Sequence, residues 1–333
     1  MFENRLFALA LAGLALGSIR ESQAAIWSED FSVAPVTRGW KIFGDTNLFV
    51  WNPTNQALQV TWDSSKTNSY FYRSLGTILA KDDDFGFEFE VRLSDIATNT
   101  KSGPFEIALG FLNLADDTNP SFWRGSGVDA VHGPRNVVEF DYFPAGSYPG
   151  FGDVAPSISP TLVSSDDGFA SGFDLLELTT NDLFHIDLAY TASNQTLHTT
   201  ITRNGLSFGP VQDVALGTNF TDFRLNAFAI SSYSDFGDDY DSVIAHGIID
   251  NVSITIPPPP VTMVVGGSIN GLWSVQFGSR TNWVYTLERT LNFQSWATAS
   301  SPLSGTGSNL ILAETNSPPA AAFYRIRADK VGR

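Results

Sequence analysis

Two carboxylates lie within an apolar segment in the middle of the chain. The segment VVEFDYFP, residues 137–144, sets Glu139 and Asp141 among large apolar side chains. Its β-branched and aromatic residues and its lack of glycine predict a strand. In a strand, residues two apart point to the same face, with their Cα atoms about 6.5 to 7 Å apart. Two carboxylates in this arrangement suit a catalytic acid pair, a metal site or the polar face of a sheet.

Further strands are predicted on both sides of this segment. Apolar and polar residues alternate over residues 85–93, 105–111 and 184–190, as in strands with one buried face. The dipeptide NG at residues 204–205 favours the type I′ turn of a hairpin. His185 and His198 lie on the polar sides of facing strands there, which predicts a cross-strand pair. With no amphipathic helical pattern in the mature chain, the sequence predicts an all-β antiparallel jelly-roll sandwich.

The first 24 residues have the features of a signal peptide. Arg5 is followed by an apolar run over residues 6–19 and then by SQA, residues 22–24, which signal peptidase accepts. A helix needs about 20 apolar residues to cross a bilayer, so this run is too short to be a span. We expect an exported protein that is extracellular, periplasmic or at the cell surface, with no transmembrane segment after signal cleavage.

A run of four prolines, residues 257–260, divides the mature chain. Polyproline can neither join the centre of a sheet nor continue a helix, so it acts as a stiff spacer. Residues 25–260 hold 11 Lys and Arg against 30 Asp and Glu, whereas residues 261–333 hold 6 against 3. About five strands are predicted after the prolines. We expect a sandwich over residues 25–256, a linker over 257–260 and a small C-terminal β module over 261–333.

Composition narrows the possible functions. The 333 residues carry a net charge of −16, which disfavours nucleic acid and anionic membrane surfaces as partners of the whole chain. The chain has no cysteine, which excludes disulfides, a thiolate nucleophile and a cysteine-held zinc ion. No Ser/His/Asp arrangement and no Gly-rich phosphate loop can be argued either.

Three segments, FGFEFEVRL, PFEIALGFL and VVEFDYFP, resemble successive strands of concanavalin-like jelly rolls. That superfamily includes legume-type lectins and laminarinase-type glycoside hydrolases. The detailed resemblance covers residues 83–155, while EDF near the start and IIDNVSITI before the linker look like the first and last strands of secreted members. The resemblance implies a sandwich that either binds or hydrolyses sugars.

The hydrolase motif is incomplete in this chain. In the laminarinase-type motif, a Glu nucleophile and an Asp precede an acid/base Glu, and Glu139 and Asp141 match the first two. The acid/base position falls on Phe143 or, with a bulge, on Pro144, and neither can donate a proton. Asp153 in the following loop is the remaining candidate for that acid. We therefore predict no catalytic residues and no enzymatic activity, and a laminarinase-like glycosidase is the weakest alternative.

The lectin motif implies a calcium site. In the legume-type motif, the Glu and the Asp bind metal ions, and the aromatic residue two positions later offers its carbonyl. Carried over, these residues are Glu139, Asp141 and Phe143, with Asp153 as a further carboxylate. Hard oxygen ligands suit calcium. The Asn of the motif falls on Ala145, which departs from the family pattern. No His lies between His132 and His185 to act as the transition-metal ligand, so a second, transition-metal site is not expected.

A glycan site would have to differ from that of the legume family. The family's sugar-binding Asp has no counterpart at residues 102–104, which are SGP. Trp123, Tyr148 and Phe151 lie among Gly and Pro in loops, where side chains often reach the surface. Flat aromatic faces suit the CH groups of sugars, so these three are the predicted ligand-binding residues. The alternative is that they close the ends of the sandwich.

Two alternatives to this metal site remain open. The pair at residues 139 and 141 could be an ordinary acidic face, solvent-exposed or hydrogen-bonded. The acidic segment SDFGDDYDS, residues 234–242, is a second calcium candidate, although it fits no EF-hand spacing. A solvated acidic loop is the plainer interpretation of that segment.

The favoured function is that of an exported, non-catalytic protein that binds a polysaccharide or cell-surface glycan, with calcium as its candidate cofactor. The alternative is a structural or adhesive envelope protein without a small ligand. The FYRIRA ending of the C-terminal module resembles short C-terminal β modules of many secreted bacterial proteins. That resemblance implies a role in sorting or attachment, and a packing module without a separate task is the alternative.

Overall fold

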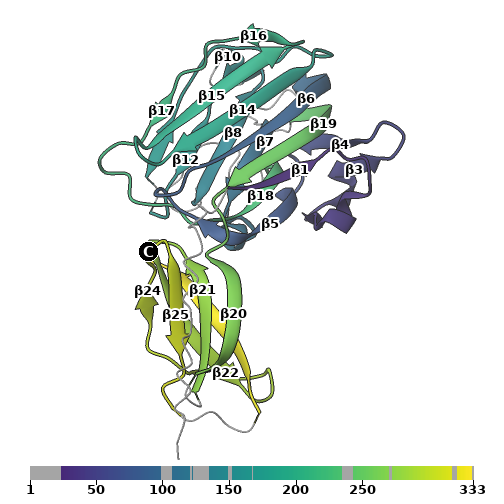
Figure 1. The fold of residues 1–333 in the computed structure, drawn as a ribbon. Helices are drawn as coiled ribbons and strands as arrows, with labels where there is room; N and C mark the ends of the chain where they lie inside the picture. The colour runs from purple at the N-terminus through teal and green to yellow at the C-terminus, as the bar shows by residue number, and fades with distance from the viewer. Residues whose placement is uncertain are drawn as a thin grey trace, which may run out of the picture.

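The computed structural model describes residues 24–98, 107–120, 122, 135–148, 152–166, 168–234, 243–269, 272–316 and 321–331. The strands form a large sandwich of two sheets and a smaller module at one end of it, which contains the C-terminus (Figure 1). Every pair of neighbouring strands in the sandwich is antiparallel. The predicted all-β jelly-roll sandwich followed by a small β module is therefore confirmed.

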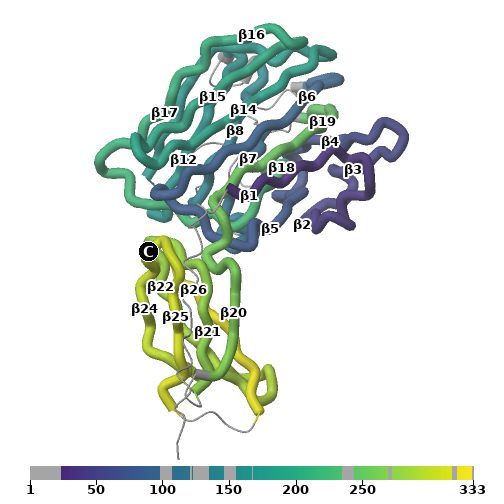
Figure 2. The backbone as a smooth tube through the Cα atoms, viewed as in Figure 1, coloured from purple at the N-terminus to yellow at the C-terminus, as the bar shows by residue number. Residues whose placement is uncertain are grey.

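The first sheet of the sandwich has nine strands. Its order is β16 (Leu206–Phe208), β15 (Thr196–Arg203), β14 (Phe184–Thr191), β6 (Phe85–Thr98), β19 (Val243–Ile256), β4 (Ala57–Asp63) and β3 (Phe49–Asn52). In addition, β1 (Ala25–Glu29) pairs with β19, and β17 (Val214–Ala215) pairs with β15. The first and last strands of the sandwich thus lie side by side (Figure 2).

The second sheet has eight strands and carries the segment with the two carboxylates. Its order is β13 (Phe169–Ser171), β12 (Thr161–Val163), β8 (Val137–Phe143), β7 (Ile107–Leu112), β18 (Leu225–Ser232), β5 (Ser69–Leu79) and β2 (Lys41–Phe43). The short β11 (Ser157–Ile158) also pairs with β8. The carboxylate segment is therefore in the interior of a sheet, between β7 on one side and β11 and β12 on the other.

Few other elements occur in the sandwich. They are the helical turn α1 (Leu114–Asp117), two 3₁₀ turns at Pro35–Arg38 and Thr46–Leu48, and the small pair β9 (Gly146–Tyr148) and β10 (Gly152–Val154). The hairpin predicted at Asn204 and Gly205 joins β15 to β16, and both residues have positive φ, as a type I′ turn requires. Of the helices in the part of the chain described, none has the length and apolar character to span a bilayer.

The main core lies between the two sheets, and the period-two alternation builds it. Phe87 and Phe89 of β6 are buried against Phe111 and Phe140 of the opposite sheet, with ring centroids 5.4 and 5.7 Å apart. Buried aromatic pairs of this kind add about 0.5–1.5 kcal/mol each beyond the area that they bury. Large aromatic residues at alternate positions therefore fix which face of each strand points inward.

The C-terminal module has its own two sheets and its own hydrophobic cluster. One sheet holds β20 (Val261–Ile269), β21 (Leu272–Ser279) and β25 (Asn309–Ala313), and the other holds β23 (Ala297–Thr298), β22 (Trp283–Thr290), β24 (Leu303–Ser304) and β26 (Phe323–Lys330). The prediction of about five strands omitted β20 and the two-residue β24. Of these, β20 is the longer and lies at the edge of its sheet. This edge strand exposes Met263, Val264 and Val265, so it lacks the alternation of a half-buried strand.

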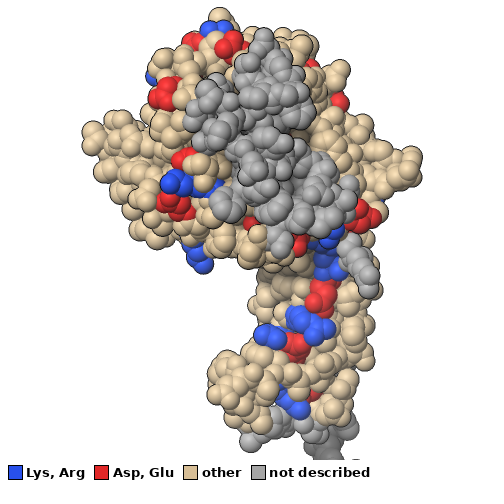
Figure 3. Space-filling model, turned by 180° about the vertical axis from the view of Figure 1, so that it is seen from behind, with Lys and Arg blue, Asp and Glu red and all other residues tan. Residues whose placement is uncertain are grey.

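Ion pairs join the module to the sandwich. The Lys330 ammonium lies 2.9 Å from a carboxylate oxygen of Asp82 and 2.9 Å from one of Asp83. The Arg280 guanidinium lies 2.6 Å from the other oxygen of Asp83. Basic and acidic residues are both visible along one face of the module in Figure 3. Within the module, buried Glu288 pairs with Arg325 and Arg327. The prolines at 257–260 therefore do not hold the two parts away from each other.

Candidate functional site on the outer face of the eight-stranded sheet

Strand β8 directs its two carboxylates away from the main core. Val138, Phe140 and Tyr142 point into that core, as the alternation predicts, so Glu139 and Asp141 lie on the outer face of the sheet. Both carboxylates are nevertheless fully buried, with 1% of Glu139 and none of Asp141 exposed. A solvent-facing acidic pair, one of the alternatives from the sequence, is therefore wrong, because this outer face is covered.

Small residues surround the carboxylates on the neighbouring strands. Glu139 pairs with Gly110 of β7, and Asp141 pairs with Ala108 of the same strand. A Cβ at position 110 would lie 2.3 Å from the Val138 carbonyl oxygen and 2.5 Å from the Glu139 Cα. Only glycine fits there, because any side chain would push β7 and β8 apart. Because Gly110 and Ala108 are small, the space beside β8 on this face is available to the two carboxylate side chains.

A tyrosine from the end of β18 contacts the site directly. The hydroxyl of Tyr233 donates a hydrogen bond of 2.8 Å to Oε2 of Glu139. The ring of Tyr233 packs edge-on against Tyr70, with centroids 5.9 Å apart. Tyr70 in turn donates from its hydroxyl to the Asp117 carbonyl at 3.0 Å. These tyrosines belong to a second hydrophobic cluster on the outer face, which also includes Val137. The carboxylates therefore lie at the edge of an aromatic layer.

Two serine hydroxyls lie on the same face as Asp141. Ser157 of β11 pairs with Phe143, and Ser231 of β18 lies in the same row as Asp141, with Ala108 between them. Both serines are buried, and neither Oγ has a hydrogen-bond partner in this structure. Because a buried hydroxyl without a partner costs free energy, these two oxygens are potential contacts for an additional polar group.

The other predicted ligands lie further along the chain. Phe143 is the last residue of β8, and its backbone is part of the pairing with Ser157. Asp153 lies in β10, opposite Ser147 of β9, and Tyr148 pairs with Gly152 in the same small hairpin. Trp123, Phe151 and the acidic segment 235–241 lie outside the described residues. The calcium ligand set, Glu139 and Asp141 included, and the aromatic sugar contacts thus stay predictions.

Within the described part of the chain, no three-residue metal cluster surrounds the pair. Among the described side chains, no group of three or more His, Cys, Asp or Glu is placed to hold a metal ion. Glu139 and Asp141 supply carboxylate oxygens, and further ligands would have to be hydroxyl or carbonyl oxygens. An all-oxygen set fits a hard cation such as calcium and not zinc or copper.

Sequence reasoning missed several residues of this face. Tyr233, Ser157 and Ser231 lie far from β8 in the sequence, and only strand pairing brings them to it. The predicted pair of His185 and His198 is wrong, because His185 faces Thr202 and His198 faces Ala189. Each histidine contacts a carboxylate instead: His185 lies 3.5 Å from Glu88, and His198 lies 2.5 Å from Asp213.

Several solved structures are similar to this chain. Lectin I from Ulex europaeus, in complex with the methyl glycoside of α-L-fucose, aligns with a TM-score of 0.45 and 14% identity over 71% of this chain and 99% of its own. Peanut lectin aligns with a TM-score of 0.44 and 12% identity over 70% and 97%. The exoplasmic/lumenal domain of VIP36, in its Ca²⁺- and Man3GlcNAc-bound form, aligns with a TM-score of 0.39 and 14% identity over 68% and 86%.

The resemblance is one of fold. At these identities and TM-scores it assigns no role to any residue of this chain. No protein-family model matches the sequence, and no curated protein matches it either. The function must therefore be argued from the buried carboxylates and their surroundings.

Proposed function

We propose that this chain is an exported, non-catalytic glycan-binding protein that uses calcium bound at Glu139 and Asp141. The observation that carries the proposal is the complete burial of two carboxylates, two residues apart, on the outer face of a sheet. Burying carboxylates is costly unless cations or hydrogen bonds compensate them. The Tyr233 hydroxyl supplies one hydrogen bond to Glu139. A bound cation would add to the compensation that groups of the protein give both charges.

The donor chemistry supports calcium as that cation. Calcium takes six to eight oxygen ligands from carboxylates, carbonyls and water, in flexible geometry. Glu139 and Asp141 would hold it, and the hydroxyls of Ser157 and Ser231 are candidates for contacts through water. When bound, calcium supplies positive charge and open positions for further oxygen ligands. Trp123, Tyr148 and Phe151 stay the predicted aromatic contacts for the glycan.

A glycan suits this face better than a charged or purely apolar ligand. Sugars offer hydroxyl groups to polar side chains and apolar CH faces to aromatic rings, which suits the predicted contacts Trp123, Tyr148 and Phe151. Glu139 and Tyr233 are each 1% exposed, so they would support such a site from beneath and not contact the sugar. Two of the similar structures are also recorded with sugars bound, the methyl glycoside of α-L-fucose in lectin I from Ulex europaeus and Man3GlcNAc in VIP36. The absence of an acid/base carboxylate at Phe143 and Pro144 supports a binding role without turnover.

A glycan array with the exported protein tests this proposal. We expect saturable binding that is lost on calcium chelation and that falls at least tenfold in Glu139→Gln and Asp141→Asn. Glu88→Gln and Glu90→Gln are the matched controls, because these two residues are also two apart on one strand but lie on the other sheet. Binding that survives chelation and both β8 variants would contradict the calcium role.

Other outcomes would support the competing functions. If the array shows no saturable binding, and cells that lack the gene have a defect in envelope structure or in adhesion, the structural or adhesive alternative is favoured. Release of reducing sugars from β-glucans, abolished by Glu139→Gln, would favour a glycosidase. Either result would overturn the proposed function.

A further inference from the structure

Exposed apolar side chains gather at one end of the C-terminal module. Leu291 and Phe293, in the turn after β22, are 66% and 59% exposed, and Phe323, the first residue of β26, is 50% exposed. The ring centroid of Phe293 lies 4.1 Å from that of Phe323 and 6.3 Å from that of the partly exposed Trp296. Exposed apolar residues usually occur singly, so a cluster of this kind indicates an interaction surface. We call these four residues the apolar tip.

The apolar tip lies at the end of the module that is remote from the sandwich. Strand β26 runs from Phe323 to Lys330, and Lys330 contacts Asp82 and Asp83 of the sandwich. A strand of this length spans roughly 23 Å from its first to its last residue. In Figure 2 the C-terminus lies beside the sandwich, in keeping with this direction of β26. The tip is therefore the part of the module that can reach a surface ahead of the sandwich.

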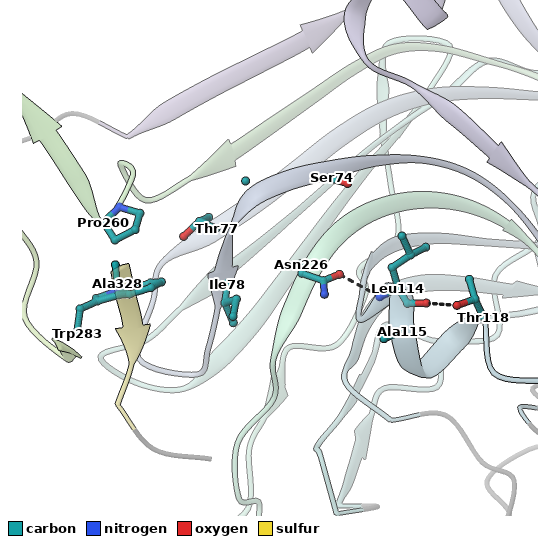
Figure 4. Close-up of a pocket in the computed structure, with 11 residues that line it drawn as sticks. Ser74, Thr77, Ile78, Leu114, Ala115, Thr118, Asn226, Pro260, Trp283 and Ala328 are labelled. Atoms are coloured by element: carbon teal, nitrogen blue, oxygen red, sulfur yellow. Dashed lines mark hydrogen bonds between the residues drawn. The ribbon is translucent and has the colours of Figure 1, made fainter. Parts of the chain in front are cut away.

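The cleft at the opposite end of the module offers a different surface. Its lining includes Pro260, Trp283 and Ala328 of the linker and module, and Leu114 and Asn226 of the sandwich (Figure 4). Trp283 is only 3% exposed and belongs to the module's own core. A ligand in this cleft would not reach the Trp283 ring, whereas the rings of the apolar tip are accessible to a partner.

The turn that carries Phe293 is ordered by its own hydrogen bonds. The N–H of Phe293 donates a 3.0 Å hydrogen bond to Oγ1 of Thr290. Oδ1 of Asn292 accepts from the N–H groups of Gln294 and Ser295 at 2.9 and 3.2 Å. Phe293 itself has φ +59°, which is strained for a bulky residue and which glycine adopts readily. The turn alone does not explain an exposed aromatic ring at this position.

Paired charges follow the apolar tip along β26. The Arg325 guanidinium lies over the Trp296 ring, 4.1 Å from its centroid. Arg325 and Arg327 both pair with buried Glu288. Arg327 also pairs with Asp329. The charges of these two arginines and two carboxylates cancel. The order along the strand is therefore apolar side chains, then an aromatic ring with a cation, then balanced charges.

This order of groups suits a lipid surface better than a sugar or a charged polymer. The polar groups beside the rings are already engaged, because Asn292 accepts from backbone N–H groups and Arg325 donates to Glu288 at 2.7 Å. A sugar needs hydrogen bonds from such groups, whereas acyl chains need none. Trp and Arg suit the boundary between acyl chains and water, because each has an apolar body and a polar end.

We propose that the apolar tip inserts into the surface of a phospholipid bilayer. Leu291, Phe293 and Phe323 enter the acyl region, and Trp296 with Arg325 lies at the level of the headgroups. Apolar burial drives the interaction, so anionic lipid is not required. The acidic sandwich lies well beyond the Debye length of about 8 Å from the tip, so its charge is screened from the lipid. The inference goes beyond the proposed function, because it gives the module a role in attachment that needs neither calcium nor a glycan.

Co-flotation of the full-length mature protein with phosphatidylcholine vesicles tests this inference. We expect a bound fraction that rises with lipid concentration and does not fall when salt is added. Phe293→Gly removes the ring but suits the left-handed turn, so it should lower the partition coefficient at least threefold without unfolding the module. Phe323→Thr keeps a residue that favours strands and should have a similar effect.

Two matched controls remove exposed apolar side chains elsewhere. Met263→Gly is the control for Phe293→Gly, because Met263 also has positive φ, +51°, and is 84% exposed, but lies in β20 close to the linker. Phe173→Thr is the control for Phe323→Thr, because Phe173 is 61% exposed on the sandwich. Neither control should change the partition coefficient.

The results separate this inference from the proposed glycan site. Calcium chelation and Glu139→Gln should leave flotation unchanged, whatever they do on the array. Absence of flotation, or equal losses in the tip variants and their controls, would overturn the inference. Flotation that requires anionic lipid or is lost in salt would contradict insertion by apolar side chains. If Phe323→Thr does not melt cooperatively, Phe293→Gly alone decides.

Discussion

Two strands of this sandwich carry nearly the same pattern and place it in opposite environments. Strand β6 contains FEFEV at residues 87–91, and strand β8 contains VEFDY at residues 138–142. In both, large apolar residues enter the main core and two carboxylates point outward. On β6 the Glu88 side chain is 43% exposed, whereas on β8 Glu139 is 1% exposed. The alternation of apolar and acidic residues determines which residues share a face of the strand, but not whether that face is exposed to solvent.

The neighbours of each pair explain the difference. Glu88 faces Asp187 directly on the adjacent strand and lies near His185, so it belongs to a polar, solvated surface. Glu139 lies beside Gly110 and within hydrogen-bond distance of Tyr233, on a face covered by a second hydrophobic cluster. A carboxylate on the first face is stabilised by water. On the second face, groups of the protein or a bound ion must replace that water.

A third acidic site shows how the chain itself can stabilise a buried carboxylate. Asp83 is 2% exposed, and both its oxygens contact cations, Arg280 at 2.6 Å and Lys330 at 2.9 Å. Next to it, burial acts to raise the pKa of Asp82, but the hydrogen bond and charge of Lys330 outweigh burial and lower that pKa below its usual value. Our account assigns to calcium at β8 the role that these two side chains have at the module contact.

The largest effect is expected from Asp83→Asn. Removing one partner of a buried ion pair leaves uncompensated charge and typically costs about 3–5 kcal/mol. Here Arg280 would lose its carboxylate partner, and Lys330 would keep only Asp82. We expect a loss of about 3 kcal/mol in denaturant unfolding. Asp329→Asn, whose carboxylate is 52% exposed, is the control and should cost less than about 1 kcal/mol. Equal effects would show that burial does not distinguish these carboxylates.

Gly110→Ala should have the next largest effect, because it forces β7 away from the Glu139 backbone. Overpacking of this kind costs about 1–3 kcal/mol, and here the clash is with backbone atoms at 2.3 and 2.5 Å. We therefore expect a loss of about 2–3 kcal/mol, in the upper part of that range. Gly217→Ala is the matched control, because a Cβ at 217 would meet nothing within 4 Å. If the two variants had the same melting temperature, the close approach of β7 and β8 at Gly110 would be contradicted.

Tyr233→Phe should destabilise the protein by about 2 kcal/mol, since hydrogen bonds to charged groups contribute about 1.5–3 kcal/mol. The hydroxyl that it removes donates to Glu139 within a buried cluster. Tyr72→Phe, at the edge of the same cluster, is the control and should be close to neutral. If Tyr233→Phe left the free energy of unfolding unchanged, the stability of buried Glu139 would not depend on this hydrogen-bond donor.

The smallest effect is expected from Asp187→Asn, on the solvent-exposed face of the nine-stranded sheet. Burial raises the pKa of Asp187, and so does the like charge of Glu88, which faces Asp187 on the neighbouring strand β6. The folded state therefore favours protonated Asp187, and the penalty from its charge grows as the pH rises from about 4 through the raised pKa. Asp187→Asn should stabilise the protein by about 0.5 kcal/mol at pH 8 and not at pH 3. A gain of the same size at both pH values would exclude this charge effect.

Much of the fold could be predicted from the sequence, and little of the site could. Period two in Phe85, Phe87 and Phe89 predicted the strand and its buried face, and Asn204-Gly205 predicted a hairpin, because both signals are local. The burial of Glu139 and its contact with Tyr233 depend on pairings between residues 94 positions apart. The strand β20 was missed because it lacks a local signal: its apolar residues are exposed and do not alternate with polar ones.

The measurement that tests the central claim most directly is the melting temperature as a function of calcium. If only the folded state binds the ion, stability should rise by about 2.7 kcal/mol at 100 times Kd, and Glu139→Gln and Asp141→Asn should each remove most of that rise. Glu88→Gln and Glu90→Gln, the equivalent pair on β6, should leave it unchanged. A wild-type melting temperature that stays constant through millimolar calcium would contradict the account.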